Sequence, residues 1–155
     1  MFEIDSIPAE ILSLLREKGI SEEELLLGAY CDRNLEQEVA QTYLFATASE
    51  LVILSGQMQA QCDPAAKKGR SPRILRVWHE QSFDRYPIGD LKKIQIEELL
   101  STGRLCAARK EEDAPLLLAC FTNFCKESMY LFAKYANKIS QGEFSEVDPK
   151  DYPEE

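Results

Sequence analysis

The sequence predicts a mainly β fold with helices, in which seven antiparallel strands are followed by one long helix. Between residues 25 and 120, short runs rich in aliphatic, aromatic and β-branched residues alternate with polar turn clusters. From residue 121 to 140 the apolar residues recur at helical spacing instead. The chain has 155 residues, of which 45% are hydrophobic and 29% are charged, so it has the size and composition of one globular domain.

A helix and a short helical turn are expected before the first strand. Pro8 suits the first turn of a helix, and one face of the segment that follows is apolar through Ile7, Ile11, Leu12 and Leu15. Ser21 and Glu24 have the spacing of a capping box, while Ile20 and Leu25 are placed to pack as a hydrophobic staple. The pattern therefore predicts a helix from Pro8 and a helical turn from Ser21.

The strands are expected to form two clear hairpins. The first turns at residues 47–50, and the second alternates Ile94 and Ile96 inward before a turn at residues 101–103. The long segment from Gln57 to Ser71 contains Pro64 and Gly69 and is expected to be a mobile loop. The predicted strands are 25–31, 42–48, 50–56, 74–80, 91–99, 104–110 and 116–120.

The last helix is expected to cover the sheet with an apolar stripe. The stripe comprises Phe121, Phe124, Cys125, Ser128, Phe132, Tyr135, Ala136 and Ile139. A half-covered antiparallel sheet needs such a lid. We expect one contiguous core that includes Phe45, Leu51, Ile53, Ile94, Ile96, Leu105, Leu116, Leu118, Phe132 and Tyr135.

This order of elements is that of a pleckstrin-homology-like (PH-like) barrel, in which two roughly orthogonal sheets enclose a core and a C-terminal helix closes one end. The sequence then divides into an N-terminal helical segment (1–24), the barrel with its helix (25–140) and an acidic tail (141–155). From residue 142 the tail has six carboxylates against the single Lys150, so it is interpreted as a linker or a frayed end.

Composition excludes several classes of function. A formal net charge of −9 argues against nucleic acid as a partner, because binding to phosphates needs clustered Lys and Arg.

The five cysteines show no CxxC spacing, which is unlike a zinc site or a disulfide framework, and we expect no cofactor in this chain. The single histidine, His79, follows Trp78 in a predicted strand and is interpreted as a strand residue and not as a catalytic base. No catalytic motif is found, and no apolar run approaches the ~20 residues that span a bilayer.

One basic segment is the candidate binding site. It lies in a loop and at the start of the next strand of an otherwise acidic protein, and it comprises Lys67, Lys68, Arg70, Arg73 and Arg76. Three interpretations remain open: a solvated loop, a contact with phosphate groups or an anionic membrane, and a contact with another protein domain. Beside anionic headgroups, each basic residue would contribute about 1 kcal/mol of binding.

Three segments, 42–56, 86–110 and 116–144, resemble the N-terminal cytosolic domain of bacterial fused ABC transporters, which carry permease and ATPase on one polypeptide. The resemblance rests on the pattern and on short signatures: Tyr86-Pro87 before Asp90-Leu91, the "GRL" at 103–105, and the "FTN" at 121–123. It covers roughly residues 25–143. The phosphate-binding loop of the ATPase is not in this chain, so ATP and Mg would be bound elsewhere in the parent protein.

Three classes of function follow. The leading expectation is a non-catalytic regulatory or docking domain of an ABC-type exporter, at the cytoplasmic face of the plasma membrane, whose partners are the permease and ATPase parts of the same polypeptide. The alternative is a free-standing PH-like module that binds anionic lipid or phosphate through the basic residues at 67–76. The third is an unrecognised enzyme.

Overall fold

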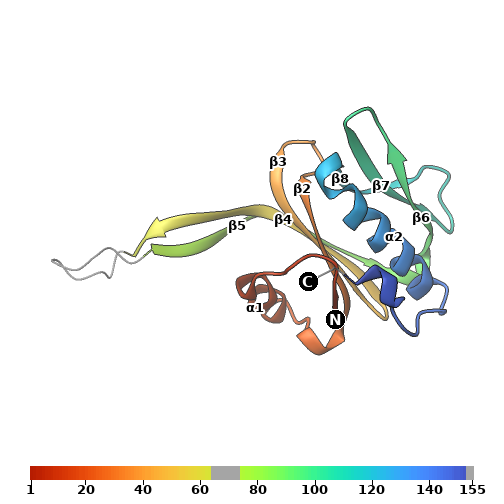
Figure 1. Ribbon diagram of the computed structural model, residues 1–155, viewed down its shortest axis with the longest axis horizontal. Coiled ribbons are helices and arrows are strands. Elements are labelled where there is room, and N and C mark those ends of the chain that lie inside the picture. The colour runs from red at the N-terminus through yellow and green to blue at the C-terminus, as the bar shows by residue number, and fades with distance from the viewer. Residues whose placement is uncertain (64–73, 153–155) are drawn as a thin grey trace.

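The computed structural model describes residues 1–63 and 74–152, which form an antiparallel sheet with helices on both sides (Figure 1). The strands are β1 (Phe2–Glu3), β2 (Leu25–Arg33), β3 (Val39–Thr47), β4 (Glu50–Cys62), β5 (Ile74–Pro87), β6 (Leu91–Glu98), β7 (Thr102–Arg109) and β8 (Leu116–Thr122). The helices are α1 (Ala9–Glu17) and α2 (Lys126–Ser140), with short 3₁₀ turns η1 (Glu22–Glu24), η2 (Ile88–Asp90), η3 (Asn123–Cys125) and η4 (Pro149–Asp151).

The strand order in the described chain is β5-β4-β3-β2-β8-β7-β6, and β1 pairs in parallel with β2. Every other pair is antiparallel. The predicted α+β class is therefore confirmed, and each of the seven predicted strands is present. The turn between β3 and β4 falls at residues 48–49, as expected, whereas the turn between β6 and β7 lies two residues earlier than expected.

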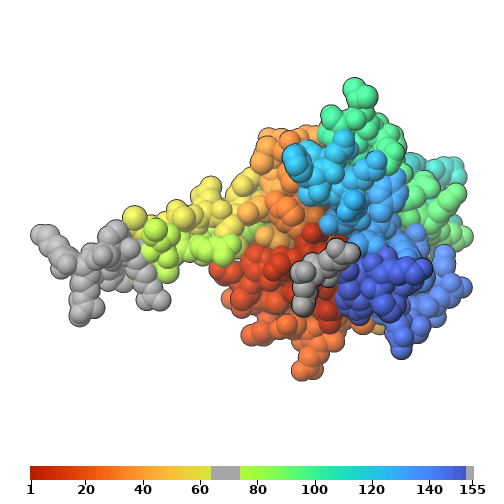
Figure 2. Space-filling view, in the orientation of Figure 1, coloured from red at the N-terminus to blue at the C-terminus, as the bar shows by residue number. Residues whose placement is uncertain are grey.

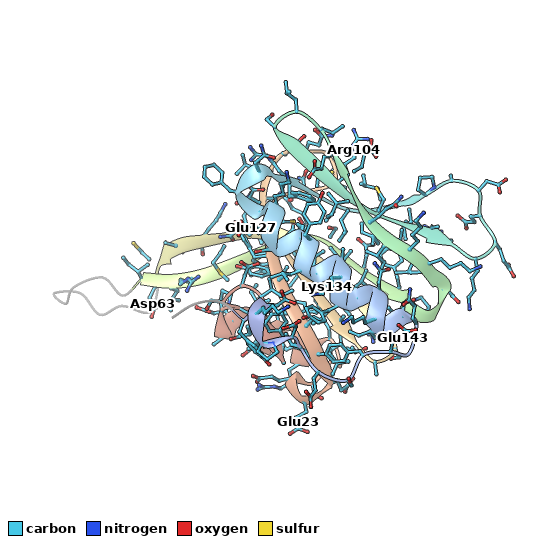
Figure 3. The ribbon with its side chains drawn as sticks, turned by 45° about the vertical axis from the view of Figure 1, so that its right-hand side comes forward. Glu23, Asp63, Arg104, Glu127, Lys134 and Glu143 are labelled. Carbon is cyan, nitrogen blue, oxygen red and sulfur yellow. The ribbon has the colours of Figure 1, made fainter. Side chains whose placement is uncertain are left out.

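Strands β2 and β3 and the first part of β4, residues 51–56, are covered on both faces, because α1 covers one face and α2 lies toward the other (Figures 1 and 3). Alternate residues of these strands accordingly belong to two separate apolar clusters. On β3, Leu44 and Ala46 pack in the cluster with α2, while Tyr43 and Phe45 pack in the cluster with Ile11 and Leu15 of α1. The prediction of a single core is wrong for Phe45, since helix α1 gives the sheet a second apolar layer.

Helix α2 packs on the sheet through its predicted stripe, with two corrections at its N-terminal end. Phe132 and Tyr135 are fully buried against the sheet. Phe121, however, belongs to β8, and Phe124 in the η3 turn is 98% exposed, because η3 breaks the helical periodicity before Lys126. Ile96 and Leu116 are half-buried at the border of the same cluster.

The predicted capping box is not formed. Ser21 Oγ donates to the side chain of Glu24 at 3.1 Å, and no side chain caps the η1 turn. The staple residues Ile20 and Leu25 are both buried in the α1 cluster, so they fix the entry of the chain into β2 without the cap.

Two carboxylates join β2 to the C-terminal half of the domain. Asp32 accepts the backbone N–H of Thr122 at 2.9 Å and also the hydroxyl of that threonine. Asp5 accepts the backbone N–H of Tyr30 and the hydroxyl of Ser128, both at 2.9 Å. Burial on its own would raise the pKa of Asp32, but the hydrogen bonds from Thr122 outweigh it and hold that pKa below its ordinary value.

The tail packs against the domain from residue 142 to residue 152, which differs from the expectation of a linker or frayed end. Phe144 and Val147 pack at the edge of the α2 cluster. The hydroxyl of Tyr135 donates to Asp151, which also pairs with Lys134 at 2.7 Å. The sequence pattern did not predict this contact, because the tail has no apolar periodicity and its Asp151 is bound by the hydroxyl of a residue in α2, Tyr135.

Helix α2 can be tested as the lid of the sheet. Phe132→Ala should lower the free energy of unfolding by about 3–5 kcal/mol, because it opens a cavity in the core. Phe124→Ala is the matched control, since that ring is 98% exposed, and it should change stability by less than about 0.5 kcal/mol. Urea denaturation of both variants provides the measurement, and equal effects of the two substitutions would contradict the packing described here.

The Asp32 junction predicts a dependence of stability on pH. A carboxyl group whose pKa is lower in the folded state stabilises the fold fully above its unfolded value of about 3.9, and this contribution is lost as the pH falls through the folded pKa. The wild-type protein should therefore lose stability on acidification below about pH 4. Asp32→Asn should cost roughly 1.5–3 kcal/mol at neutral pH and should flatten the profile in that acid window.

Thermal unfolding between neutral and acid pH measures this effect. Glu23→Gln is the control, because this exposed carboxylate lies in the η1 turn, away from the junction. If the stability of the wild type and of Asp32→Asn changed with pH in parallel, the Asp32 carboxylate would not be the source of the acid sensitivity.

Candidate docking surface on the β4–β5 arm

Strands β4 and β5 continue beyond the rest of the sheet as a two-stranded ribbon (Figures 1 and 2). The last residue pair between β3 and β4 is Gln41 with Gly56. From there β4 pairs only with β5, from Gln57 with His79 to Cys62 with Ile74. We call residues 57–62 and 74–79 the arm, and Asp63 lies at its outer end in Figure 3.

The root of the arm is a β-bulge that requires glycine. The ladder shifts between Ser55 and Gly56, so that Gln81 has no partner residue on β4. A Cβ atom at Gly56 would lie 2.3 Å from the carbonyl oxygen of His79 and 2.7 Å from the ring of Trp78. Bulges bend the strand that carries them and increase its twist. The bulge therefore marks the point where the ribbon leaves the body.

One face of the arm is apolar, and only its inner part is covered. Residues that pair directly share a face, which gives the set Met58, Ala60, Cys62, Ile74, Arg76 and Trp78. Met58 and Trp78 pack against the α1 cluster, and the Trp78 ring lies 6.0 Å from that of Tyr43. Ala60, Cys62 and Ile74 are exposed, and the exposed fraction of Ile74 is 67%.

The opposite face of the arm is mostly polar. It carries Gln57, Gln59, Gln61, Leu75, Val77 and His79. His79 lies 3.4 Å from the side chain of Gln61, between their Nε2 atoms. His79 is thus an exposed strand residue, as the sequence suggested.

Helix α1 and its C-cap residue Lys18 make charged contacts with β5, in the arm and at its root. Arg76 pairs with Glu10 at 3.2 Å, and Lys18 pairs with Glu80 at 2.9 Å. The Lys18 ammonium also lies 4.4 Å from the centre of the Phe83 ring. Burial raises the pKa of the Tyr43 hydroxyl beside this contact, while Arg76 lowers it and Glu10 raises it further. Both ion pairs are partly exposed to solvent, so each contributes at most about 1 kcal/mol to stability.

Of the five basic residues that the sequence singled out, the structure describes one. Lys67, Lys68, Arg70 and Arg73 lie outside the described residues. Arg76 lies on the apolar face of the arm. The expectation of a loop from Gln57 is wrong up to Cys62, because these residues belong to β4. The strict alternation of glutamine with Met58, Ala60 and Cys62 was the signal that could have predicted this strand.

Other kinds of site find less support in the described residues. No group of three or more His, Cys, Asp or Glu side chains is placed to hold a metal ion in residues 1–63 and 74–152. Four cysteines are buried, and burial raises the pKa of Cys125 to about 12, so it is protonated at neutral pH. Within the same residues, no helix is both long and apolar enough to cross a membrane.

Comparisons with protein-family models, with curated proteins and with solved structures give no match to this chain. The arm and the sheet that carries it are therefore interpreted from their own geometry.

The glycine at the root of the arm supplies a test of this geometry. Gly56→Ala should cost about 1–3 kcal/mol or more, because the new methyl group meets the backbone carbonyl oxygen of His79, which cannot rotate away, and the ring of Trp78. Hydrogen exchange at the amides of residues 57–62 should accelerate more than exchange in β7. Gly89→Ala is the control, since no atom lies within 4 Å of its added Cβ. Equal stability of the two variants would contradict the close packing at the bulge.

Proposed function

We propose that this protein is a non-catalytic docking domain, and that the arm is the element that binds its partner. The observation that carries the proposal is the exposed apolar end of the arm. A two-stranded hairpin on its own is only marginally stable in water. The arm nevertheless keeps a regular ladder of six residue pairs beyond β3, with Ile74 and Leu75 exposed at its outer end. A partner that covers this end would bury apolar surface and stabilise the ribbon.

The fold we propose is PH-like, and the strand order supports it. With β1 left aside, four strands follow one another as a meander from β2 to β5, and three more run from β6 to β8. The first strand of one group meets the last strand of the other, and α2 follows that last strand. The sequence pattern predicted the chain order of a PH-like barrel, seven strands followed by one helix, and the neighbours of each strand in the sheet were not part of that prediction. Such a fold serves many functions, so the docking role rests on the arm and not on the fold.

The partner we propose is the permease or ATPase part of a fused ABC transporter. The resemblance of residues 42–56, 86–110 and 116–144 to the cytosolic domain of these transporters supports this choice. In that setting ATP and Mg would be bound by the ATPase part, and this domain would act through its surface at the cytoplasmic face of the membrane. The arm is suited to reach a neighbouring domain, because it projects from the body (Figure 2).

Photo-crosslinking in the native host tests the proposal. A photoreactive residue replacing Leu75 should crosslink to a polypeptide that mass spectrometry identifies as carrying permease or ATPase sequence. The same residue at Leu100 is the control, because Leu100 is fully exposed but lies in the turn between β6 and β7. The proposal would be contradicted if the two positions gave the same crosslinked products, or if the Leu75 products contained no transporter sequence.

A second candidate is an anionic membrane surface. It is favoured by Arg76, which lies close to the exposed Ile74 and Leu75 on the same strand. A vesicle-binding assay tests this candidate. Binding of the isolated domain to vesicles that contain phosphatidylserine, with an affinity that falls as salt is added, would favour it. The transporter candidate predicts no such binding by the isolated domain.

A further inference from the structure

A polar recess opens between the two halves of the sheet, beside the root of the arm. Its outer part has a volume of about 370 Å³ and is lined by the β2–β3 turn and by Gln81 and Ser82 of β5. A smaller inner cavity of about 10 Å³ continues from it, between Ser55, Asp84 and Ala119. The two parts share Asn34, Leu35 and Ser82. We call the two parts together the polar mouth.

Buried polar side chains gather at this place. In the described residues the buried polar side chains are Asn34, Thr42, Thr47 and Ser55. All of them except Thr47 line the polar mouth. They are hydrogen-bonded within the protein, as buried polar groups need to be, and they give this cavity a polar wall.

The hydrogen atoms of these side chains are already used, which leaves oxygen acceptors. The Thr42 hydroxyl donates to the carbonyl oxygen of Arg33 at 2.8 Å. Ser55 must therefore be the donor in its 2.8 Å bond with Thr42, since a hydroxyl has one hydrogen. The Asn34 amide donates to the side-chain oxygens of Glu38 and Gln81. The Ser55 oxygen keeps capacity to accept, and it lines the inner cavity.

The charge around the mouth is negative. Glu36 and Glu38 lie at its outer rim and Asp84 lines the inner cavity, against one guanidinium, that of Arg33. Within residues 1–63 and 74–152, none of the three carboxylates takes part in an ion pair. Arg33 donates to the carbonyl oxygen of Asp32, next to it in the chain. Three carboxylates against one cation attract a positively charged ligand.

We propose that the polar mouth binds a small organic cation through a primary ammonium group. An ammonium group has three N–H donors and no acceptor, which complements the Ser55 oxygen and the Asp84 carboxylate. The inner cavity has room for a group about the size of a water molecule, which fits an ammonium head and excludes a quaternary one. The outer recess holds the rest of the ligand, beside Glu36 and Glu38. This site is independent of the docking role of the arm.

Titration of the ¹⁵N-labelled protein with 1,4-diaminobutane, followed by NMR at constant ionic strength, tests the proposal. The amide signals of Ser55, Ser82 and residues 34–38 should shift most and should saturate together. Neutral 1,4-butanediol and tetramethylammonium should leave these signals unchanged, because the first lacks the charge and the second lacks N–H donors.

Two variants locate the site. Asp84→Asn should weaken diamine binding roughly ten-fold, which corresponds to about 1.4 kcal/mol. Glu36→Gln is a second variant at an exposed position, and it should weaken binding even if the Asp84 variant folds poorly. Glu23→Gln removes the same charge far from the mouth and should leave binding unchanged (Figure 3). Absence of saturable shifts in the wild type, equal shifts with butanediol, or equal effects of Glu36→Gln and Glu23→Gln would overturn the assignment.

Discussion

The junction between β2 and β8 is the constraint on which the rest of this structure depends. These strands share one residue pair, Arg33 with Cys120, whereas β2 pairs with β3 along most of its length. Backbone hydrogen bonds therefore contribute little to joining the two halves of the sheet. Side chains supply the connection, through Asp32 bonded to Thr122 and Asp5 bonded to Ser128. Each is a charge-assisted bond, and such bonds are stronger than those between neutral groups.

Helix α2 completes the junction from its other side. The Asn137 side chain accepts the backbone N–H of Ile94 at 2.7 Å and donates to the carbonyl of the same residue at 2.6 Å. The helix thereby continues the hydrogen bonding of β6 where the ladder is irregular, between Lys92 and Gln95. Its buried stripe contacts β2 and β6 together, so the helix ties the two halves through apolar burial as well as through polar bonds.

The period of the apolar residues predicted the elements of this fold, but it did not predict their partners. Part of each of the strands β2 to β8, and helix α2, could be predicted from apolar runs, alternation or helical spacing, whereas residues 57–62 of β4 and 81–87 of β5 were not predicted as strand. The packing of Phe45 in a second cluster could not be predicted in this way, since it depends on which face of the sheet α1 covers. The packing of the tail on the domain could not be predicted either, because it depends on the hydrogen bond that the Tyr135 hydroxyl donates to Asp151. A single long-range polar contact leaves no periodic trace in the sequence.

The candidate site was predictable only in part for a related reason. The basic residues drew attention to the segment around Arg76, although the polar alternation from Gln57 to Cys62 was missed. The polar mouth could not be predicted, because Asn34, Ser55 and Asp84 are distant in the sequence and become neighbours only through the open junction of the sheet. A closed ladder between the halves would have left no cavity for them to line.

The same bulge that directs the arm also shapes the polar mouth. Gln81 has no partner residue on β4, and its side chain accepts from Asn34 at 3.3 Å, at the rim of the mouth. A bound cation that competed for the Gln81 oxygen would therefore act at the root of the arm. A ligand shifts a conformational equilibrium only by the difference of its affinities for the two states. Glycine at position 56 lets the carbonyl oxygen of His79 and the ring of Trp78 lie close to the opposite strand at the same bulge. The proposed docking and the proposed cation binding therefore use different residues around one bulge: the arm from Gln57 outward, and Gln81 at the rim of the mouth.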